Sequence, residues 1–355
     1  MGLLAPPTKK LGEWKYLNVQ MFQKKHDNYI GGTSDMKKHF WKFSLVLVLM
    51  LAILAGCGST EESNEGNKNN EQTEEQTAAF PVTITDDAGN KVTIEEQPDA
   101  IVSLLPSVTE TLFAVGLDDE IVGVSDYDNY PAETADIQKV GSMDLNLEAI
   151  LALQPDVAFL QDYHVTNASD GIKQLQEAGI EVVIVEIGST FDSVYESIEM
   201  IGKATGKPTE AEQIVTDMKD KVNELQKKAE GITETKSVWV EISPQPDIYT
   251  AGNGTYINEM LEMIGAVNVA GDLEGWPKVS EEEAVNMNPD VILTTYGYYV
   301  EDATEQILNR DGWQEVTAVK NGDVYDVDSD MVTRSGPRLV DGMEEIAKAV
   351  YPDVF

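Results

Sequence analysis

The sequence has only one cysteine and three histidines among 355 residues, and its three arginines are Arg310, Arg334 and Arg338. A single cysteine excludes a disulfide framework within one chain. Acidic side chains outnumber basic ones by 63 to 25, and the formal net charge of −38 argues against a nucleic-acid-binding protein, which needs clustered lysine and arginine. Because His164 is the only histidine beyond residue 39, a zinc or manganese site built on several histidines is not expected.

Motifs that mark common enzyme classes are also missing. There is no Gly-x-Ser-x-Gly nucleophile elbow and no Walker A sequence, and the segment 252–254 lacks the third glycine of a dinucleotide-binding loop. A His-Ser-Asp triad that uses His164 stays open, although this side chain is expected at the surface or at the rim of a pocket. We predict a binding protein with no catalytic residue, cofactor or bound metal. The alternative is a surface enzyme of unknown chemistry.

Residues 36–57 have the pattern of an export signal. Lysines give a positive start, and the apolar run 45–55 is shorter than the ~20 residues that a membrane-spanning helix needs. The run ends in Leu-Ala-Gly-Cys, which resembles the lipobox of bacterial lipoproteins. We therefore expect residues 36–56 to be a signal peptide and Cys57 to be acylated, which would anchor the protein in the membrane on its extracytoplasmic face. The alternative is an ordinary secretory signal.

The segments on either side of this signal carry no predicted fold. Signal peptides begin with their charged region, so residues 1–35 are predicted to be an untranslated or non-native extension, with translation starting at Met36. Residues 57–79 begin with the acylated cysteine and continue as a polar, low-complexity stretch, which is expected to be a disordered tether.

From residue 80 onward, short apolar segments alternate with helical patterns. After a hairpin predicted at 80–97, the strand segments are apolar throughout, which is typical of parallel strands covered by helices on both faces. Strands are predicted at 100–104, 120–124, 157–160, 181–185, 237–242, 291–295 and 324–327. Helices are predicted at 106–115, 147–153, 171–178, 256–264 and 281–287, and a last helix is expected to open at residues 335–337.

One helical segment is longer than the others. In residues 208–230 apolar side chains recur at helical spacing without an internal breaker, and Gly231 follows as a stop signal. This segment is either one more surface helix or a rigid connection between two lobes. A rigid connection predicts that the lobes close by only a few degrees when a ligand binds.

The two halves of the chain repeat each other weakly. Glu148 precedes a Pro-Asp-Val segment at the same spacing at which Glu282 precedes a second one. We therefore predict an α/β fold of two Rossmann-like lobes, each with a central parallel sheet, and a ligand cleft between them. The first lobe is predicted at 80–207, the connecting helix at 208–231 and the second lobe at 232–355.

Aromatic residues follow several predicted strands, at the edge where open α/β sheets bind ligands. They are Tyr127, Tyr130, Tyr163, Trp276, Tyr296, Tyr298 and Tyr299. For each one alone, packing into the local core explains the residue as well as ligand contact does. Together they predict an aromatic-lined cleft.

The order of several short motifs resembles one known family. The motifs include Thr85-Asp-Asp-Ala-Gly-Asn90, Pro106-Ser107-x2-Glu110, Asn146-Leu147-Glu148, Asn288-Pro289-Asp290 and Gly336-Pro337-Arg338. With them, residues 80–355 resemble the helical-backbone (class III) substrate-binding proteins of bacterial ABC importers, which capture cobalamin, ferric siderophores or haem. The resemblance implies a receptor, expected to be monomeric, that delivers a small molecule to a permease dimer with its ATPase subunits.

Within this family the sequence is most similar to the vitamin B12 binders. Tyr127 and Tyr130 lie in a segment that looks like their corrin-facing tyrosine segment, and Trp276 in one that looks like their tryptophan segment. Asp330 lies in a segment whose aspartate can contact the ligand. The ligand-binding set predicted with this resemblance is Tyr127, Tyr130, Tyr163, Trp276, Tyr296, Asp330 and Arg334.

Two observations bear on the ligand. The tryptophans that the B12-binding pattern has near Ser142 and Gln161 are absent. A receptor for a strongly anionic siderophore would carry several basic groups in its pocket, and this chain offers only three arginines and scattered lysines. We predict a corrinoid ligand, and the alternative is a ferric siderophore of the hydroxamate type or haem.

The resemblance also implies a docking role for two glutamates. Glu148 and Glu282 match, by position, surface glutamates of the family that dock on permease arginines. Ordinary solvated glutamates on two helices are the alternative interpretation.

Overall fold

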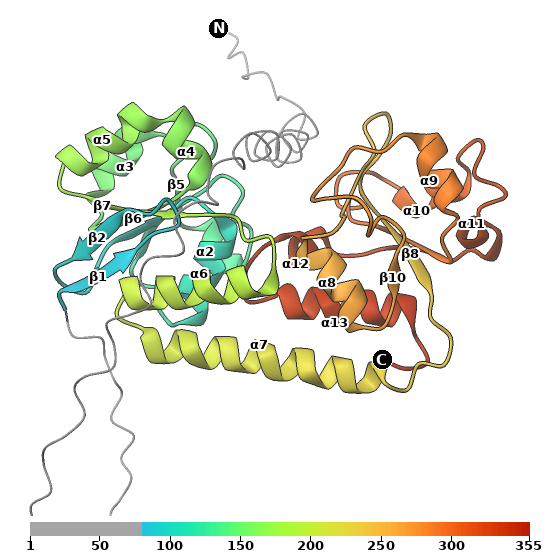
Figure 1. Ribbon diagram of the computed structural model, residues 1–355. Coiled ribbons are helices and arrows are strands. Elements are labelled where there is room, and N and C mark those ends of the chain that lie inside the picture. Colours follow the sequence, from blue (N-terminus) through green and yellow to red (C-terminus); the bar gives the residue numbers. More distant parts are fainter. Residues whose placement is uncertain (1–79) are drawn as a thin grey trace, which may run out of the picture.

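The computed structural model describes residues 80–355, so the predictions for residues 1–35, the signal peptide, Cys57 and the tether lie outside the described residues. Two α/β lobes lie side by side above one long helix, α7 (Pro208–Ala229), which runs beneath both (Figure 1). The predicted fold class, with parallel sheets in two lobes and one long connecting helix, is confirmed. None of the described helices is both long and apolar enough to cross a membrane.

The first lobe is built on a five-stranded sheet in which all neighbouring strands are parallel. Its central strands are buried almost throughout, because helices cover both faces of the sheet. In spatial order the strands are β5 (Gln138–Lys139), β4 (Ile121–Val124), β3 (Ile101–Ser103), β6 (Val157–Gln161) and β7 (Glu181–Val185). The antiparallel hairpin of β1 (Val82–Thr85) and β2 (Lys91–Ile94) packs beside β7. The helices are α2 (Pro106–Ala114), the 3₁₀ helix η1 (Ala132–Ala135), α3 (Leu147–Leu153), α4 (Asp162–Asn167), α5 (Ser169–Glu177) and α6 (Phe191–Ala204).

The second lobe repeats this plan with a smaller parallel ladder. In spatial order its strands are β10 (Val267–Asn268), β8 (Ser237–Ser243), β11 (Val291–Thr294) and β12 (Val324–Asp326), and β9 (Tyr249–Thr250) pairs antiparallel with β8. Its helices are α8 (Tyr256–Met263), α9 (Glu281–Met287), α10 (Ala303–Leu308), α11 (Thr317–Asn321), α12 (Ser329–Thr333) and α13 (Leu339–Val350). The equivalent helices α3 and α9 both end at a left-handed residue, Gln154 and Asn288, which supports the predicted repeat.

The apolar core is continuous across the lobes on one side only. A single cluster joins buried residues of α2 and α6 in the first lobe, α7 beneath, and α8 and α13 in the second lobe. The outer face of each sheet has its own separate cluster, under α3 and α5 in the first lobe and under α9 to α11 in the second. Separating the lobes on the α7 side would therefore expose apolar surface to water, and the hydrophobic effect opposes this.

The long helix α7 has the apolar stripe that its spacing predicts. Its buried residues Ala211, Val215, Met218, Val222 and Leu225 repeat at alternating steps of four and three. The first part of this stripe packs against α6, and the later part meets α8 and α13. In the structure, α7 therefore contacts helices of both lobes.

Some elements were not predicted, and α6 is the largest of them. Thr190 caps this helix by accepting the backbone N–H of Ser193, whose hydroxyl lies 3.1 Å from the Thr190 nitrogen. Val194, Ile198 and Ile201 form its buried face. The capping pair and the apolar spacing were present in the sequence, so this helix was predictable.

The predicted start of the last helix was wrong. Residues 335–337 precede the helix, and α13 begins at Leu339. Gly336 accepts a hydrogen bond from the Leu339 backbone N–H at 3.1 Å, which makes this segment a turn. The turn directs the Arg338 side chain towards the first lobe, where it donates to Glu110.

Candidate functional site

The carboxyl ends of both parallel sheets carry the predicted aromatic residues. The order of the strands reverses between β3 and β6 in the first lobe, and between β8 and β11 in the second. Crevices outside the carboxyl ends of strands at such points are the usual ligand sites of α/β folds. Tyr163 follows β6, and Tyr296 and Tyr298 follow β11. The sequence-derived candidates therefore lie at the appropriate edge of each sheet.

The loop after β4 presents Tyr127 and Tyr130 from a fixed base. Ser125 donates its backbone N–H and its hydroxyl to one carboxylate oxygen of Asp128, at 2.8 and 2.6 Å. Asp128 is buried, and this burial raises the pKa of its carboxyl. Tyr127 is half-buried, whereas Tyr130 keeps 45% of its surface exposed. The loop thus turns Tyr130 towards solvent and the second lobe.

The two lobes meet at this loop. The Asn129 side-chain amide donates to a carboxylate oxygen of Asp330 at 2.7 Å, and the other Asp330 oxygen lies 3.0 Å from a guanidinium nitrogen of Arg334. The Arg338 guanidinium lies over the ring of Tyr130, 3.8 Å from its centroid. The structure therefore brings together three predicted site residues, Tyr130, Asp330 and Arg334, although their contact with a ligand stays a prediction.

Arg334 was predicted to face the ligand, but its guanidinium is bonded inside the protein. Besides Asp330, it contacts Glu110 of α2 at 3.0 Å, and its side chain is 14% exposed. Arg338 donates to the same carboxylate from Nε and Nη2, at 2.9 and 2.7 Å. Glu110 and Arg338 stand in two of the motifs noted in the sequence, but nothing in the sequence showed that they pair with each other.

Trp276 reaches this junction through one neighbour. Its ring meets Tyr256 edge-on, with centroids 5.5 Å apart, and the Tyr256 hydroxyl donates to the backbone oxygen of Thr333 at 2.8 Å. Tyr163 lies in α4 on the first lobe, where its ring meets His164 edge-on. Trp276 thus contacts the segment that carries Arg334 through Tyr256, whereas the described ring contact of Tyr163 is with His164 in the first lobe.

Tyr296 does not line an open surface, which corrects its predicted place. It is 1% exposed, and its hydroxyl donates to Oε1 of Glu241 at 2.6 Å. Arg310 holds the same buried carboxylate with both terminal nitrogens, at 2.9 and 2.7 Å. The exposed aromatic of this loop is Tyr298, at 48% exposure, and its ring meets Tyr299 edge-on. The adjacency of Tyr298 to the strand end was visible in the sequence, but the burial of Tyr296 was not.

All three arginines of the chain are therefore paired with carboxylates. Arg310 binds Glu241, and Glu110 holds both Arg334 and Arg338. With Asp330, the junction contains two arginines and two carboxylates, whose formal charges cancel. The arginines do not create a positive field for an anionic ligand.

His164 is buried rather than at the surface or the pocket rim, which corrects that expectation. Its Nε2 lies 2.7 Å from the backbone oxygen of Ser142, and its Nδ1 accepts the backbone N–H of Gln161 at 3.2 Å. Burial lowers the pKa of its imidazole. Since both ring nitrogens bind backbone groups, a catalytic triad built on this residue is not supported. Residues 80–355 contain no group of three or more His, Cys, Asp or Glu side chains that could hold a metal ion.

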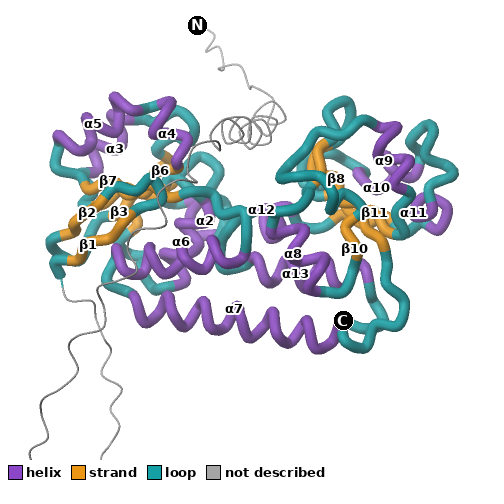
Figure 2. Tube along the Cα trace, in the orientation of Figure 1, coloured by secondary structure: helices purple, strands orange, loops and turns teal. Residues whose placement is uncertain are grey.

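The two proposed docking glutamates occupy equivalent, exposed places. Glu148 is the second residue of α3 and Glu282 the second residue of α9. Each helix is capped by a polar side chain, Asn146 in α3 and Ser280 in α9. Figure 2 shows α3 and α9 in the upper part of their lobes, with both sheets between them and α7. The two carboxylates are therefore carried on the same side of the molecule.

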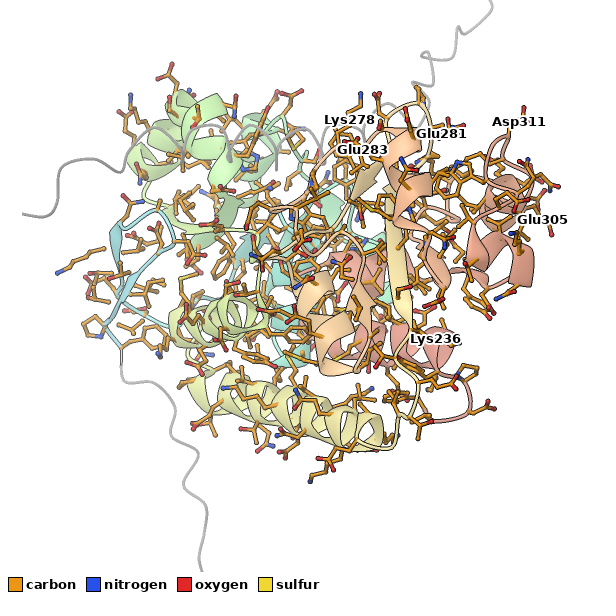
Figure 3. All side chains as sticks on the ribbon, turned by 45° about the vertical axis from the view of Figure 1, so that its right-hand side comes forward. Lys236, Lys278, Glu281, Glu283, Glu305 and Asp311 are labelled. Carbon is orange, nitrogen blue, oxygen red and sulfur yellow. The ribbon has the colours of Figure 1, made fainter. Side chains whose placement is uncertain are left out.

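A surface hollow of about 600 Å³ lies beside the start of α9. Its lining residues are Gln245, Pro246, Ile248, Lys278, Val279, Ser280 and Glu281. Figure 3 shows Lys278, Glu281 and Glu283 at this corner of the second lobe. Lys278 forms an ion pair with Asp247, and Glu281 accepts the indole N–H of Trp313 at 2.9 Å. All of these residues belong to the second lobe, so the hollow is distinct from the junction between lobes.

Comparison with known proteins decides the family. The model of the periplasmic binding protein family matches residues 101–331, which takes in the strand ends of both lobes and Asp330. The chain belongs to the periplasmic binding protein family. The family assignment makes this a binding protein rather than an enzyme, in agreement with the sequence-based prediction.

Three proteins similar to this chain show which members of the family it resembles. The uncharacterized ABC transporter substrate-binding lipoprotein YvrC of Bacillus subtilis is 45% identical over 311 residues, covering 87% of this chain and 96% of that protein. A cobalamin-binding protein of Halobacterium salinarum is 30% identical over 287 residues, covering 78% and 76%. The crystal structure of a possible iron-binding, periplasmic solute-binding protein of Staphylococcus epidermidis superposes with a TM-score of 0.66 at 33% identity, covering 72% and 100%.

Proposed function

We propose that this periplasmic binding protein captures a corrinoid outside the cytoplasmic membrane and delivers it to the permease of an ABC importer. The observation that carries the proposal is the charge-balanced junction between the lobes, edged by exposed or half-buried aromatic rings. The 30% identical cobalamin-binding relative supports the ligand class, and the 45% identical lipoprotein supports the transporter.

A corrinoid suits this junction because of its shape and charge. A corrin ring is a large, partly apolar disc with amide arms. Tyr127, Tyr130 and Trp276 offer aromatic surface to cover such a disc. Asp330 and Asn129 are bonded to each other, but the carboxylate has further lone pairs and the amide a second N–H for the amide arms. Such contacts need no surplus of positive charge.

A ferric siderophore or haem is the second candidate. The possible iron-binding protein with the same fold, at 33% identity, favours it. Anionic iron chelates and haem propionates are commonly met by free arginine or lysine. Here the arginines are already bonded to carboxylates, and both nitrogens of His164 are engaged with backbone groups. These pairings favour the corrinoid.

Calorimetric titration of the detergent-solubilised full chain tests the ligand. Cyanocobalamin, a ferric hydroxamate and haem are titrated separately under the same conditions. Binding of cyanocobalamin alone in the nanomolar range, which corresponds to about −12 kcal/mol, is the expected result. Tight binding of the ferric hydroxamate or haem without a cyanocobalamin signal would replace the corrinoid with the second candidate.

Delivery is proposed to use Glu148 and Glu282. A pseudo-symmetric receptor can offer these two carboxylates to a two-fold permease dimer, where charge-assisted bonds with arginine would set the register. Acylated Cys57, which lies outside the described residues, would hold the receptor near the permease. The two glutamates and the lipid anchor would thus both serve the delivery of the ligand to the permease.

The docking proposal has a charge-matched control. The double variant Glu148→Ala, Glu282→Ala should abolish ligand uptake by cells while the affinity of the purified protein stays unchanged. Glu305→Ala with Asp311→Ala removes the same charge from other exposed positions of the second lobe and should leave uptake intact. Equal loss of uptake in both double variants would show an effect of overall charge instead of docking.

A further inference from the structure

One buried carboxylate joins the lobes at the junction. Glu110 belongs to α2 of the first lobe, and its side chain is 2% exposed. It is bonded to two arginines of the second lobe: Arg334 at 3.0 Å from Oε1, and Arg338 at 2.7 Å from Oε1 and 2.9 Å from Oε2. Figure 1 shows α2 and α12 facing each other at the centre of the molecule. Glu110 therefore binds the second lobe through three charge-assisted hydrogen bonds.

Each of the two arginines has a second connection to the first lobe, in addition to Glu110. Arg334 contacts Asp330, which accepts the Asn129 amide, and Arg338 lies over the Tyr130 ring. Both Asn129 and Tyr130 are in the loop that Asp128 fixes from inside. The segment that carries Arg334 and Arg338 is thus bonded to α2 and to this loop at once.

The network is buried at its centre and exposed at its ends. Glu110 is nearly inaccessible, and the arginine side chains keep only 14% and 18% exposure. Tyr130 and the Asp330 side chain keep 45% and 30%. The exposed ends are the groups that the proposed function assigns to the ligand, while the buried centre has no access to it. The position of the binding groups therefore depends on a residue that a ligand cannot touch.

We propose that Glu110 is the positioning residue of the binding site. By holding Arg334 and Arg338, it fixes the angle between the lobes at the junction of α2 and α12 and places Tyr130 and Asp330 for the ligand. This inference deepens the proposed function and rests on it only for the identity of the ligand. The positioning of the lobes by Glu110 is independent of which ligand binds.

The test measures the distance between the lobes in the free full chain. Spin labels are attached to keto amino acids that replace Lys173 on the first lobe and Glu305 on the second, both exposed, so that Cys57 is left untouched. Pulsed electron paramagnetic resonance gives the distance distribution, and calorimetry gives the affinity for cyanocobalamin. Glu110→Gln removes the charge and keeps the size of the side chain. Arg338→Lys keeps the charge but loses the paired hydrogen bonds to Glu110 and the guanidinium contact with the Tyr130 ring.

Glu241→Gln is the matched control. It replaces a buried carboxylate that also accepts two hydrogen bonds from one arginine, but both residues belong to the second lobe. We expect Glu110→Gln and Arg338→Lys to broaden the distance distribution and weaken cyanocobalamin binding about tenfold. Glu241→Gln should lower thermal stability without broadening the distribution.

The outcomes separate this inference from the proposed function. A distribution as narrow as wild type in a folded Glu110→Gln or Arg338→Lys protein would overturn the positioning role. If Glu110→Gln does not fold, Arg338→Lys alone decides. Broadening in both variants, with no cyanocobalamin binding even by the wild type, would support the positioning role and refute the corrinoid.

Discussion

Two regions of this molecule hold its lobes together by different means. On the α7 side, one apolar core runs from α2 and α6 through α7 to α8 and α13. At the junction of α2 and α12, the contacts are hydrogen-bonded charges around Glu110. Apolar contacts tolerate changes of shape if volume is kept, whereas bonded charges demand a particular geometry. The apolar core therefore keeps the lobes joined, and the Glu110 junction sets their relative orientation.

The largest effect is expected from a buried charge that does not span the lobes. Glu241→Ala leaves Arg310, which is 7% exposed, without its carboxylate, and should lower the free energy of unfolding by about 3–5 kcal/mol. Urea denaturation measures this. Glu110→Ala should cost less, because its arginines keep partial access to water.

A double replacement is the control for this variant. Glu241→Leu with Arg310→Met removes both charges and should recover part of the lost stability, since no unpaired charge remains and the Tyr296 hydroxyl still loses its acceptor. A double variant as unstable as Glu241→Ala would show that the loss comes from shape and not from charge.

The apolar side is tested at the centre of α7. Met218→Ala removes a side chain that is 3% exposed and should cost about 2–5 kcal/mol through lost burial and a cavity. The exposed neighbour Thr216→Ala, as a matched control, should change the free energy of unfolding by less than ~1 kcal/mol. Equal effects of the two changes would contradict the assignment of the buried face.

Binding is tested at the aromatic edge of the junction. Trp276→Ala should weaken cyanocobalamin binding by about 1–3 kcal/mol, because the ligand then covers less apolar surface. Calorimetry gives the affinity. Phe355→Ala removes a partly buried aromatic that packs beside Tyr351 after the end of α13, and it should leave the affinity unchanged. Unchanged affinity in Trp276→Ala would remove this residue from the proposed contact set.

The smallest effect is expected from an ion pair that adds to the α7 side. Lys221 of α7 bonds Asp341 and Glu344 of α13 at 2.5 and 2.8 Å, and with Lys348 it lowers the pKa of Glu344 to about 2. A carboxyl whose pKa falls on folding stabilises the fold above its unfolded value of 4.5, and this contribution disappears as the pH falls towards 2. Lys221→Met should therefore cost at most about 1 kcal/mol at pH 7.

Urea denaturation at several pH values checks this dependence. The difference between wild type and Lys221→Met should shrink below pH 4.5, when Glu344 is protonated in the unfolded chain. Lys173→Met, which removes an exposed pair with Asp170, should show almost no difference at any pH. A Lys221→Met difference that grows in acid would contradict the assignment.

The difference between the apolar core and the Glu110 junction also explains which features could be predicted from the sequence. The apolar stripe of α7 and the buried strands were predicted because their spacing is local and periodic. The helices α3 and α9 have the predicted bounds, since each has a polar cap at one end and a proline shortly after the other. The residues that predict each of these features lie within a few positions of each other in the sequence.

The polar junction was not predicted, because its partners are distant in the chain. Glu110 and Arg334 are 224 residues apart, and no local pattern connects them. Arg334 was assigned to the ligand because it lies in the Asp330 segment that resembles the vitamin B12 binders, and Tyr296 was assigned for its place after a strand. The structure shows that a carboxylate already binds each of them. Burial and pairing of single polar groups depend on tertiary contacts, which residue type does not reveal.

Small-angle scattering of the full chain with and without cyanocobalamin tests whether the apolar core and the Glu110 network hold the lobes as one rigid unit. We expect the radius of gyration of the wild type to stay the same within error when cyanocobalamin binds, because both contacts already fix the lobes. A clear decrease on binding would mean that the lobes close about a hinge, and it would contradict this rigid arrangement.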